Sequence, residues 1–129
     1  MALEFPADLR YADSHEYAAP AGIAVRVGIS AFAVDQLGDI VFVELPPVGQ
    51  VLERGASFGT VESVKAVEEM YAPVSGVVTA RNDVVIDRPE LLQQDPYGEG
   101  WLLEVEPTDP AQIDDLMAAD AYRSKVEGA

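Results

Sequence analysis

One lysine between two strand-forming segments constrains the fold of this chain more than any other feature. Residues 58–76 are rich in β-branched and aromatic residues on both sides of Lys65, and Pro73 with Ser75-Gly76 ends the second segment. This pattern predicts a β-hairpin that turns near Val64-Lys65 and carries the lysine at its tip. We expect the hairpin to place five apolar residues against each other: Val61, Val64, Val67, Met70 and Tyr71.

The composition of this turn indicates that Lys65 is an attachment site. Tight turns usually contain Gly, Asn, Asp or Pro, whereas this one reads Val-Lys-Ala. The acidic residues Glu62, Glu68 and Glu69 surround the lysine, and the Lys or Arg neighbours of a phosphate or nucleic-acid site are missing. An ordinary solvated surface lysine is the alternative interpretation, because short motif matches are frequent by chance.

The charge balance narrows the classes of partner. The 129 residues include 23 acidic and 8 basic residues, which gives a formal net charge of −15. Such a surface repels nucleic acids and anionic membranes. It favours docking onto basic surfaces of other proteins, where opposite charges speed and orient the encounter.

Several chemistries are excluded by residues that the chain lacks. It has no cysteine, so disulfides, thiolate metal sites and a cysteine nucleophile are impossible, and its single histidine, His15, cannot form a multi-histidine zinc site. No apolar run reaches membrane-spanning length, and the first residues lack a basic leader. We expect a soluble protein of a bacterial cytoplasm, in preference to a mature mitochondrial protein.

The first half of the chain reads as strands around one short helix. Residues Ile23–Ile29 alternate between apolar and other side chains, as in a half-buried strand. Ser30 is a suitable N-cap for a helix over Ala31–Leu37, which Gly38 ends. The nearly continuous apolar run Ile40–Leu45 predicts a central strand that is buried on both faces.

The second half adds strands and a terminal helix. Val77–Ala80 and Trp101–Val105 are predicted strands, Val84–Ile86 is a short apolar segment, and Pro89–Leu92 is one helical turn. Asp109-Pro110-Ala111-Gln112 resembles a capping box that opens a C-terminal helix; the apolar face of that helix would contain Ile113, Leu116 and Met117. About eight short strands without long crossovers favour an antiparallel sandwich or flattened barrel, with residues 1–129 as a single domain.

The run Ser14-His15-Glu16 contains the residue types of a hydrolytic triad. Residues adjacent in sequence rarely converge on one reacting atom, and a triad is defined by geometry. We therefore interpret this run as a polar cluster on an edge strand.

The chain resembles the H proteins of the glycine cleavage system, and the similarity extends almost from end to end. Two blocks together are highly specific: Leu37-Gly38-Asp39-Ile40-Val41-Phe42-Val43-Glu44-Leu45-Pro46 and Gly59-Thr60-Val61-Glu62-Ser63-Val64-Lys65-Ala66. The other matching motifs are Ser14-His15-Glu16, Gly28-Ile29-Ser30, Ala72-Pro73-Val74-Ser75-Gly76, Pro89-Glu90-Leu91 and Asp95-Pro96-Tyr97-Gly98-Glu99-Gly100-Trp101.

This resemblance implies a mainly β fold, a barrel-sandwich hybrid of two antiparallel sheets related to lipoyl and biotinyl domains, with short helices and a C-terminal helix. It implies lipoate in amide linkage to Lys65, with recognition by attachment enzymes through the flanking Glu62, Ser63, Val64 and Ala66. Acylation removes the lysine charge and makes its stem the root of a swinging arm. The chain would be a non-catalytic carrier subunit.

The resemblance also implies the partners. The arm would take an aminomethyl group from the pyridoxal-phosphate glycine decarboxylase (P protein) and pass it to the tetrahydrofolate-dependent aminomethyltransferase (T protein). The flavin enzyme dihydrolipoamide dehydrogenase (L protein) would then reoxidise the arm. We expect the cationic end of the loaded arm to dock against Ser14, Glu16 and Glu69, which match cleft positions of the family.

Three positions depart from the usual pattern of the family. Tyr17 stands where tryptophan usually follows His-Glu, Ala31-Phe32 stands where the helix often has an acidic or polar pair, and Gln93 replaces a common asparagine. None of them is next to Lys65, so the predicted modification is unaffected.

Three other functions are alternatives to the glycine cleavage carrier. A lipoyl-relay scaffold, which donates lipoate to other enzymes, would share the same fold and site. A biotin carrier usually has Met-Lys-Met, which differs from Val64-Lys65-Ala66. An enzyme is disfavoured by the lack of cysteine and of a convergent polar set.

Overall fold

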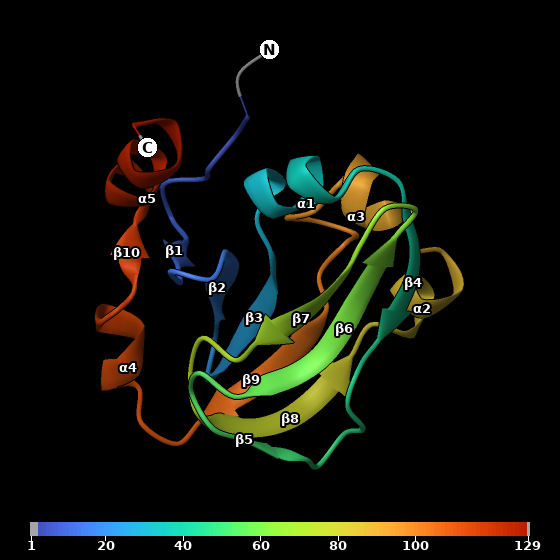
Figure 1. Ribbon diagram of the computed structural model, residues 1–129. Helices are drawn as coiled ribbons and strands as arrows, with labels where there is room; N and C mark the ends of the chain where they lie inside the picture. Colours follow the sequence, from blue (N-terminus) through green and yellow to red (C-terminus); the bar gives the residue numbers. More distant parts are fainter. Residues whose placement is uncertain (1–2, 129) are drawn as a thin grey trace.

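The computed structural model describes residues 3–128, and these form two antiparallel sheets (Figure 1). The larger sheet has the strand order β10-β1-β2-β3-β9-β8-β5, and the smaller sheet has the order β4-β6-β7. The strands of the larger sheet are β1 (Arg10–Tyr11), β2 (Glu16–Ala21), β3 (Ala24–Ile29), β5 (Val51–Leu52), β8 (Gly76–Arg81), β9 (Leu103–Pro107) and β10 (Met117–Ala118). Those of the smaller sheet are β4 (Ile40–Glu44), β6 (Ser57–Ser63) and β7 (Val67–Tyr71).

Short helices lie at the ends and side of the sandwich. They are α1 (Ala31–Leu37), α2 (Asp83–Asp87), α3 (Leu91–Gln94), α4 (Ala111–Asp114) and α5 (Ala119–Glu127). Helices α1 and α3 lie at the end of the sandwich toward which the β6–β7 hairpin points, and α5 lies at the side with β1 and β10 (Figure 1). The hairpin tip is therefore close to the end of α1, although Lys65 and Gly38 are 27 positions apart in the sequence.

The main core lies between the two sheets, where alternate residues of facing strands are buried. Val61 of β6 and Met70 of β7 pack in the same apolar cluster as Val27 of β3 and Val105 of β9, and all four are nearly inaccessible to solvent. Gly59 lets β6 approach β4 closely, because a Cβ at this position would collide with the carbonyl oxygen of Glu44. The predicted mainly β sandwich is confirmed.

A second, aromatic cluster attaches the C-terminal helix to the sheet. Tyr122 of α5 stacks on Tyr11 of β1, with ring centroids 4.7 Å apart and planes 7° from parallel. Phe5 meets the edge of Tyr122 at 5.2 Å, and Tyr17 belongs to the same cluster. The α5 helix is thereby held by aromatic packing, which contributes beyond the area it buries.

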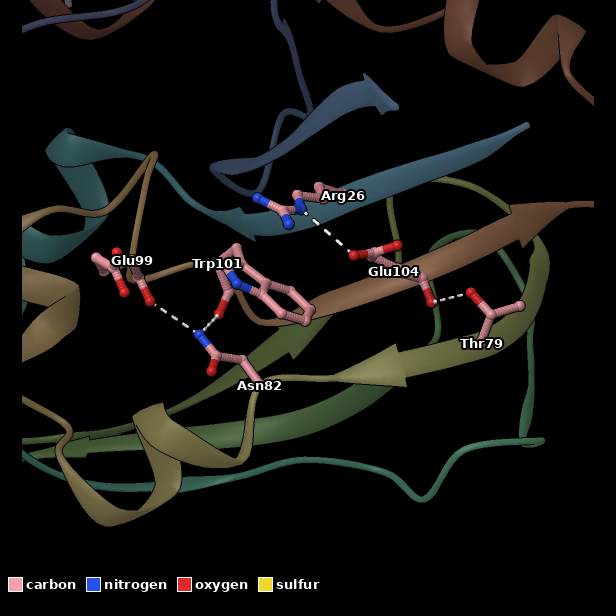
Figure 2. A network of polar contacts seen from close by, with 6 residues as sticks. All are labelled: Arg26, Thr79, Asn82, Glu99, Trp101 and Glu104. Carbon is pink, nitrogen blue, oxygen red and sulfur yellow. Dashed lines mark hydrogen bonds and ion pairs between the residues drawn. The ribbon is translucent and has the colours of Figure 1, made fainter. Parts of the chain in front are cut away.

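A polar network closes the sandwich on the face of β3 and β9 (Figure 2). The side-chain amide of buried Asn82 donates to the carbonyl oxygens of Glu99 and Trp101 at 2.8 and 2.7 Å. The guanidinium of Arg26 lies 4.8 Å above the Trp101 ring and forms an ion pair with Glu104 at 3.4 Å. These contacts fix the loop that precedes β9.

The prediction that residues 40–45 form a central strand buried on both faces is wrong. The strand exists as β4, but it is the edge of the smaller sheet, and its pairing with β6 shifts between Ile40 and Phe42. This bulge turns two consecutive side chains outward, so that Val41 is 50% and Phe42 49% exposed. Apolar composition alone could not distinguish this edge strand from a central one.

The predicted hairpin is confirmed, but its apolar residues do not all meet. Val61 and Met70 are buried in the core, whereas Val64 and Val67 are 71% and 63% exposed. The reason is strand alternation, because Val67 lies opposite Glu62 on the outer face.

The end of the chain also differs from the prediction. The helix expected after Asp109 stops at Asp114, and Met117 pairs with Tyr11 in β10 before α5 begins. Gln112 does not complete a capping box, because its side-chain oxygen accepts the backbone N–H of Ser75 at 2.6 Å. The segment Val84–Ile86 lies in α2, and Trp101 precedes β9.

Candidate functional site

The turn that presents Lys65 is held by a serine hydroxyl. The buried Oγ of Ser63 accepts the backbone N–H groups of Lys65 at 3.3 Å and Ala66 at 3.1 Å. The backbone N–H of Ser63 donates to the carbonyl of Ala66 at 2.8 Å. This side-chain bonding replaces the turn chemistry that Gly or Asn would supply, which explains how a Val-Lys-Ala turn can form.

The tip is also tied to the body of the protein. The backbone N–H of Val64 donates to the carbonyl of Asp39 at 3.0 Å. Gln93 of α3 holds the segment Asp39-Ile40 to which the tip is bonded. Its side-chain oxygen accepts the N–H of Ile40 at 3.0 Å, and its side-chain nitrogen donates to the Asp39 carboxylate at 3.4 Å. The backbone around Lys65 is therefore fixed, while the Lys65 side chain is exposed.

A cleft of about 380 Å³ begins beside the tip. It lies between the segment 14–16, helix α1 and the β6–β7 hairpin, and Ala66 forms part of its wall. Its apolar lining includes Ile29, Phe32, Leu37, Val61 and Met70. Its polar lining includes Ser14, Glu16, Gln36, Glu68 and Glu69. The cleft is thus a partly dry space with acidic groups at its wall.

The main charged group of the cleft is Glu16, which is only 2% exposed. One carboxylate oxygen accepts the hydroxyl of Ser14, and the other accepts the backbone N–H of Tyr71 at 2.9 Å. Burial raises the pKa of Glu16, and these two hydrogen bonds oppose the rise. A buried carboxylate that faces a cavity offers a strong acceptor to a cationic group.

His15 lines the cleft and connects it to α5. Its φ of 83° lies in the left-handed region, which is uncommon for a residue other than glycine. Its ring nitrogen Nδ1 lies 2.7 Å from the hydroxyl of Tyr122, and its ring packs 4.9 Å from Phe32. Burial lowers the pKa of His15. Because Ser14 donates to Glu16 and His15 bonds to Tyr122, the three neighbours do not form a triad. The predicted edge-strand position is wrong, because Ser14 and His15 precede β2, which lies between β1 and β3, and Glu16 is buried.

The predicted residues fall into two groups in space. Glu62, Ser63, Val64 and Ala66 surround Lys65 at the tip. Ser14, Glu16 and Glu69 line the same cleft although they come from distant segments, and the Tyr71 hydroxyl donates to Glu69 at 3.4 Å.

Sequence reasoning missed several cleft residues, among them Phe32, Gln36 and Tyr71. Phe32 and Gln36 are four residues apart and share one face of α1, so helical periodicity could have indicated them. The role of Tyr71 depends on its backbone N–H, for which no sequence signal exists.

Between residues 3 and 128, no helix is long and apolar enough to cross a membrane. Over the same residues, no group of three or more His, Asp or Glu side chains is arranged to hold a metal ion.

Two antiparallel sheets with an exposed lysine at a fixed hairpin tip define a carrier domain of the lipoyl type. The sequence model described as Glycine cleavage H-protein matches residues 9–129. The chain belongs to the glycine cleavage H-protein family.

Similar proteins cover the whole chain. It is 72% identical to the Glycine cleavage system H protein of Synechococcus sp. (strain RCC307), over 99% of this chain and 98% of that protein. It is 62% identical to the protein of the same name from Prochlorococcus marinus (strain MIT 9303), over 98% of both chains. The crystal structure of a glycine cleavage system H protein from Mycobacterium marinum aligns with a TM-score of 0.86 and 41% identity, over 97% of this chain and 100% of that one.

Proposed function

We propose that this chain is the lipoyl-carrying shuttle of the glycine cleavage system, with lipoate in amide linkage to Lys65. The observation that carries the proposal is an exposed lysine on a rigid, serine-held tip beside a cleft with a buried carboxylate. The lysine is the only basic residue between positions 55 and 80. Family membership supports the same assignment.

The residues at the tip fit an acylated lysine. The Lys65 side chain is exposed, and none of the ion pairs formed within residues 3–128 includes it. Its amine can therefore be acylated without breaking an ion pair. When bound, lipoate supplies the sulfur redox chemistry that a chain without cysteine lacks.

The cleft fits the cationic end of a loaded arm. A primary ammonium needs acceptors when it leaves water, and Glu16 offers a carboxylate whose position is fixed by Ser14 and Tyr71. Glu69 adds a second carboxylate at the wall. The apolar lining, with Phe32 and Met70, would limit the access of water to a labile aminomethyl group.

The partners of this function are those of the glycine cleavage system. We infer that the glycine decarboxylase, the aminomethyltransferase, dihydrolipoamide dehydrogenase and lipoate-attachment enzymes all meet the acidic surface through basic surfaces of their own. The chain itself acts as a non-catalytic carrier and a single domain over residues 1–129. A bacterial cytoplasm is the compartment that we propose, in line with the bacterial relatives.

Intact-mass measurement tests the attachment. The protein, expressed with lipoate supplied, should carry one adduct of lipoyl mass, and Lys65→Arg should remove it. Lys125→Arg is the matched control, because Lys125 is the only other lysine and lies on α5. An adduct that survives Lys65→Arg, or no adduct on the wild-type protein, would refute the proposal.

The role of Glu16 is tested separately by loading the protein with the aminomethyl group and following its decay to formaldehyde and ammonia. Glu16→Gln should speed this decay, because the amide keeps the shape of the side chain and loses its charge. Glu44→Gln is the control, since Glu44 is exposed on β4 and does not line the cleft. Equal decay rates in the wild-type protein and in Glu16→Gln would exclude a sheltering role for this carboxylate.

A further inference from the structure

Exposed apolar side chains gather on the outer face of the smaller sheet, next to Lys65. Strand register places Phe42, Glu62 and Val67 in one row across β4, β6 and β7. Since Val61 of β6 points into the core, Glu62 and its two neighbours in the row point outward. Phe42 and Val67 are 49% and 63% exposed, so apolar surface flanks Glu62 on both sides.

The apolar zone is confined to the end of the sheet that carries the lysine. Val64 follows at the tip with 71% exposure, and its backbone bond to Asp39 holds it near the start of β4. The second row away from Lys65, the next one on this face, is polar, because it contains Glu44, Thr60 and Glu69. Large exposed apolar residues beside one functional group indicate an interaction surface.

The position of this patch favours one occupant among the partners. An enzyme that acts on the distal end of a lipoyl arm can work well away from the hairpin. The enzyme that forms the amide must instead bring an activated lipoyl carboxyl group within bonding distance of the Lys65 Nζ. Such an enzyme has to cover the side chains that surround the tip.

The enzyme transfers the lipoyl acyl group to the amine of Lys65. The carbonyl carbon of an activated lipoyl donor, such as a lipoyl adenylate, forms a bond to Nζ of Lys65. The bond from the same carbon to its phosphate oxygen breaks, the nucleotide leaves with the electron pair, and Nζ loses a proton. No oxidant or reductant is needed.

We propose that Phe42, Val64 and Val67 form the docking surface for the enzyme that acylates Lys65. This inference rests on the proposed function. The partner is expected to present an apolar pocket with Lys and Arg at its rim, because Glu62 lies within the patch, Asp39 and Glu44 lie beside it, and Lys65 is the only base among them. The apolar contacts supply affinity, and the acidic rim orients the encounter.

Steady-state acylation of the unmodified protein by a purified lipoate–protein ligase, with lipoate and ATP, tests the surface. The variant Phe42→Thr/Val67→Thr keeps strand-forming residues at both exposed positions. Its KM as a ligase substrate should rise about tenfold, the effect of losing two apolar contacts at the centre of an interface. The ligase kcat should stay within about twofold, because Nζ itself is unchanged.

Val51→Thr is the matched control. Val51 is also largely exposed, but it lies on β5 in the other sheet. The KM of the Val51→Thr variant should equal that of the wild-type protein. An unchanged KM in the double variant, or an equal rise in the Val51→Thr control, would overturn the proposed surface.

A second measurement separates this surface from a general docking site. The double variant, once lipoylated at high ligase concentration, should be turned over by dihydrolipoamide dehydrogenase within about twofold of the wild-type rate, because that enzyme acts on the far end of the arm. An equal loss with both enzymes would overturn the assignment to the acylating enzyme. A wild-type protein that gains no lipoyl group would refute the proposed function itself. A lipoylated wild-type protein together with a double variant of unchanged KM would refute only the docking surface.

Discussion

The hydroxyl of Tyr122 lies 2.7 Å from Nδ1 of His15, a residue 107 positions earlier in the chain. The same hydroxyl lies 2.7 Å from Oγ of Ser30, which caps α1 by accepting the N–H of Ala33. Burial raises the pKa of Tyr122 to about 12, so the hydroxyl keeps its proton at neutral pH and can donate to one partner. One side chain of α5 therefore supports two walls of the cleft, the 14–16 segment and α1.

Tyr122→Phe should lower the free energy of unfolding by about 1–3 kcal/mol, because the half-buried His15 ring nitrogen and the buried Ser30 hydroxyl both lose this hydrogen-bond partner. Urea unfolding measures this difference. Tyr71→Phe is the control and should change stability by less than about 0.5 kcal/mol, since the Tyr71 hydroxyl makes one long bond at the surface. Equal effects of the two variants would show that the Tyr122 hydroxyl contributes little.

Glu16 should make stability depend on pH in a defined direction. Burial raises the pKa of Glu16 above the ordinary 4.5, so the folded state holds this proton more tightly than the unfolded state. The contribution of Glu16 to stability is complete below pH 4.5 and is lost as pH rises through its folded pKa. Glu16→Gln removes this titration, so the wild-type protein should lose stability relative to the variant as pH rises above 4.5.

Thermal unfolding of both proteins at a series of pH values measures this difference. A stability difference that stays constant with pH would contradict the raised pKa. Glu44→Gln, at an exposed position on β4 outside the cleft, controls for the loss of one negative charge.

Ser63→Ala should loosen the tip without unfolding the sheet. The substitution removes the acceptor of the Lys65 and Ala66 N–H groups, which should cost about 1–2 kcal/mol. Acylation of Lys65 by the ligase should slow several-fold, because the lysine loses its fixed position. Ser57→Ala, in the same strand but exposed at the far end, should leave the acylation rate unchanged.

Asn82→Ala should destabilise the protein while leaving the arm site intact. Its amide holds two backbone carbonyls in the loop before β9, and both would lose a buried donor (Figure 2). A loss of about 1–3 kcal/mol is expected in urea unfolding. Thr79→Ala, whose exposed hydroxyl bonds to the Glu104 carbonyl, is the control with a loss below about 1 kcal/mol. Acylation of Lys65 at 25 °C should be normal in both variants.

Local signals in the sequence were sufficient for much of the fold. Ser30 and Gly38 delimit α1 as their capping preferences predict, and the strand-forming residues on both sides of Lys65 place its hairpin correctly. These features depend on neighbouring residues, which a sequence displays directly. The prediction that β4 is buried on both faces was wrong, because its bulge and its edge position depend on partners elsewhere in the chain.

The Lys65 tip could be predicted from the sequence much more fully than the cleft beside it. Lys65 was indicated by its unusual turn and by resemblance, and the structure adds the role of Ser63. The cleft combines Glu16 with the backbone of Tyr71, 55 residues away, and its support comes from Tyr122. Contacts of this range follow from tertiary packing, so residue types alone could not reveal them.

The fixed backbone of the tip, held by Ser63 and Asp39, has a consequence for the strength of binding in the cleft. The proposed lipoyl arm on Lys65 would sample a small volume around this stationary point, and the cleft begins next to the point at Ala66. Short tethers of this kind give effective concentrations in the millimolar range. The cleft therefore needs only millimolar intrinsic affinity to hold its cargo for much of the time, and such weak binding lets the cargo leave quickly when an enzyme arrives.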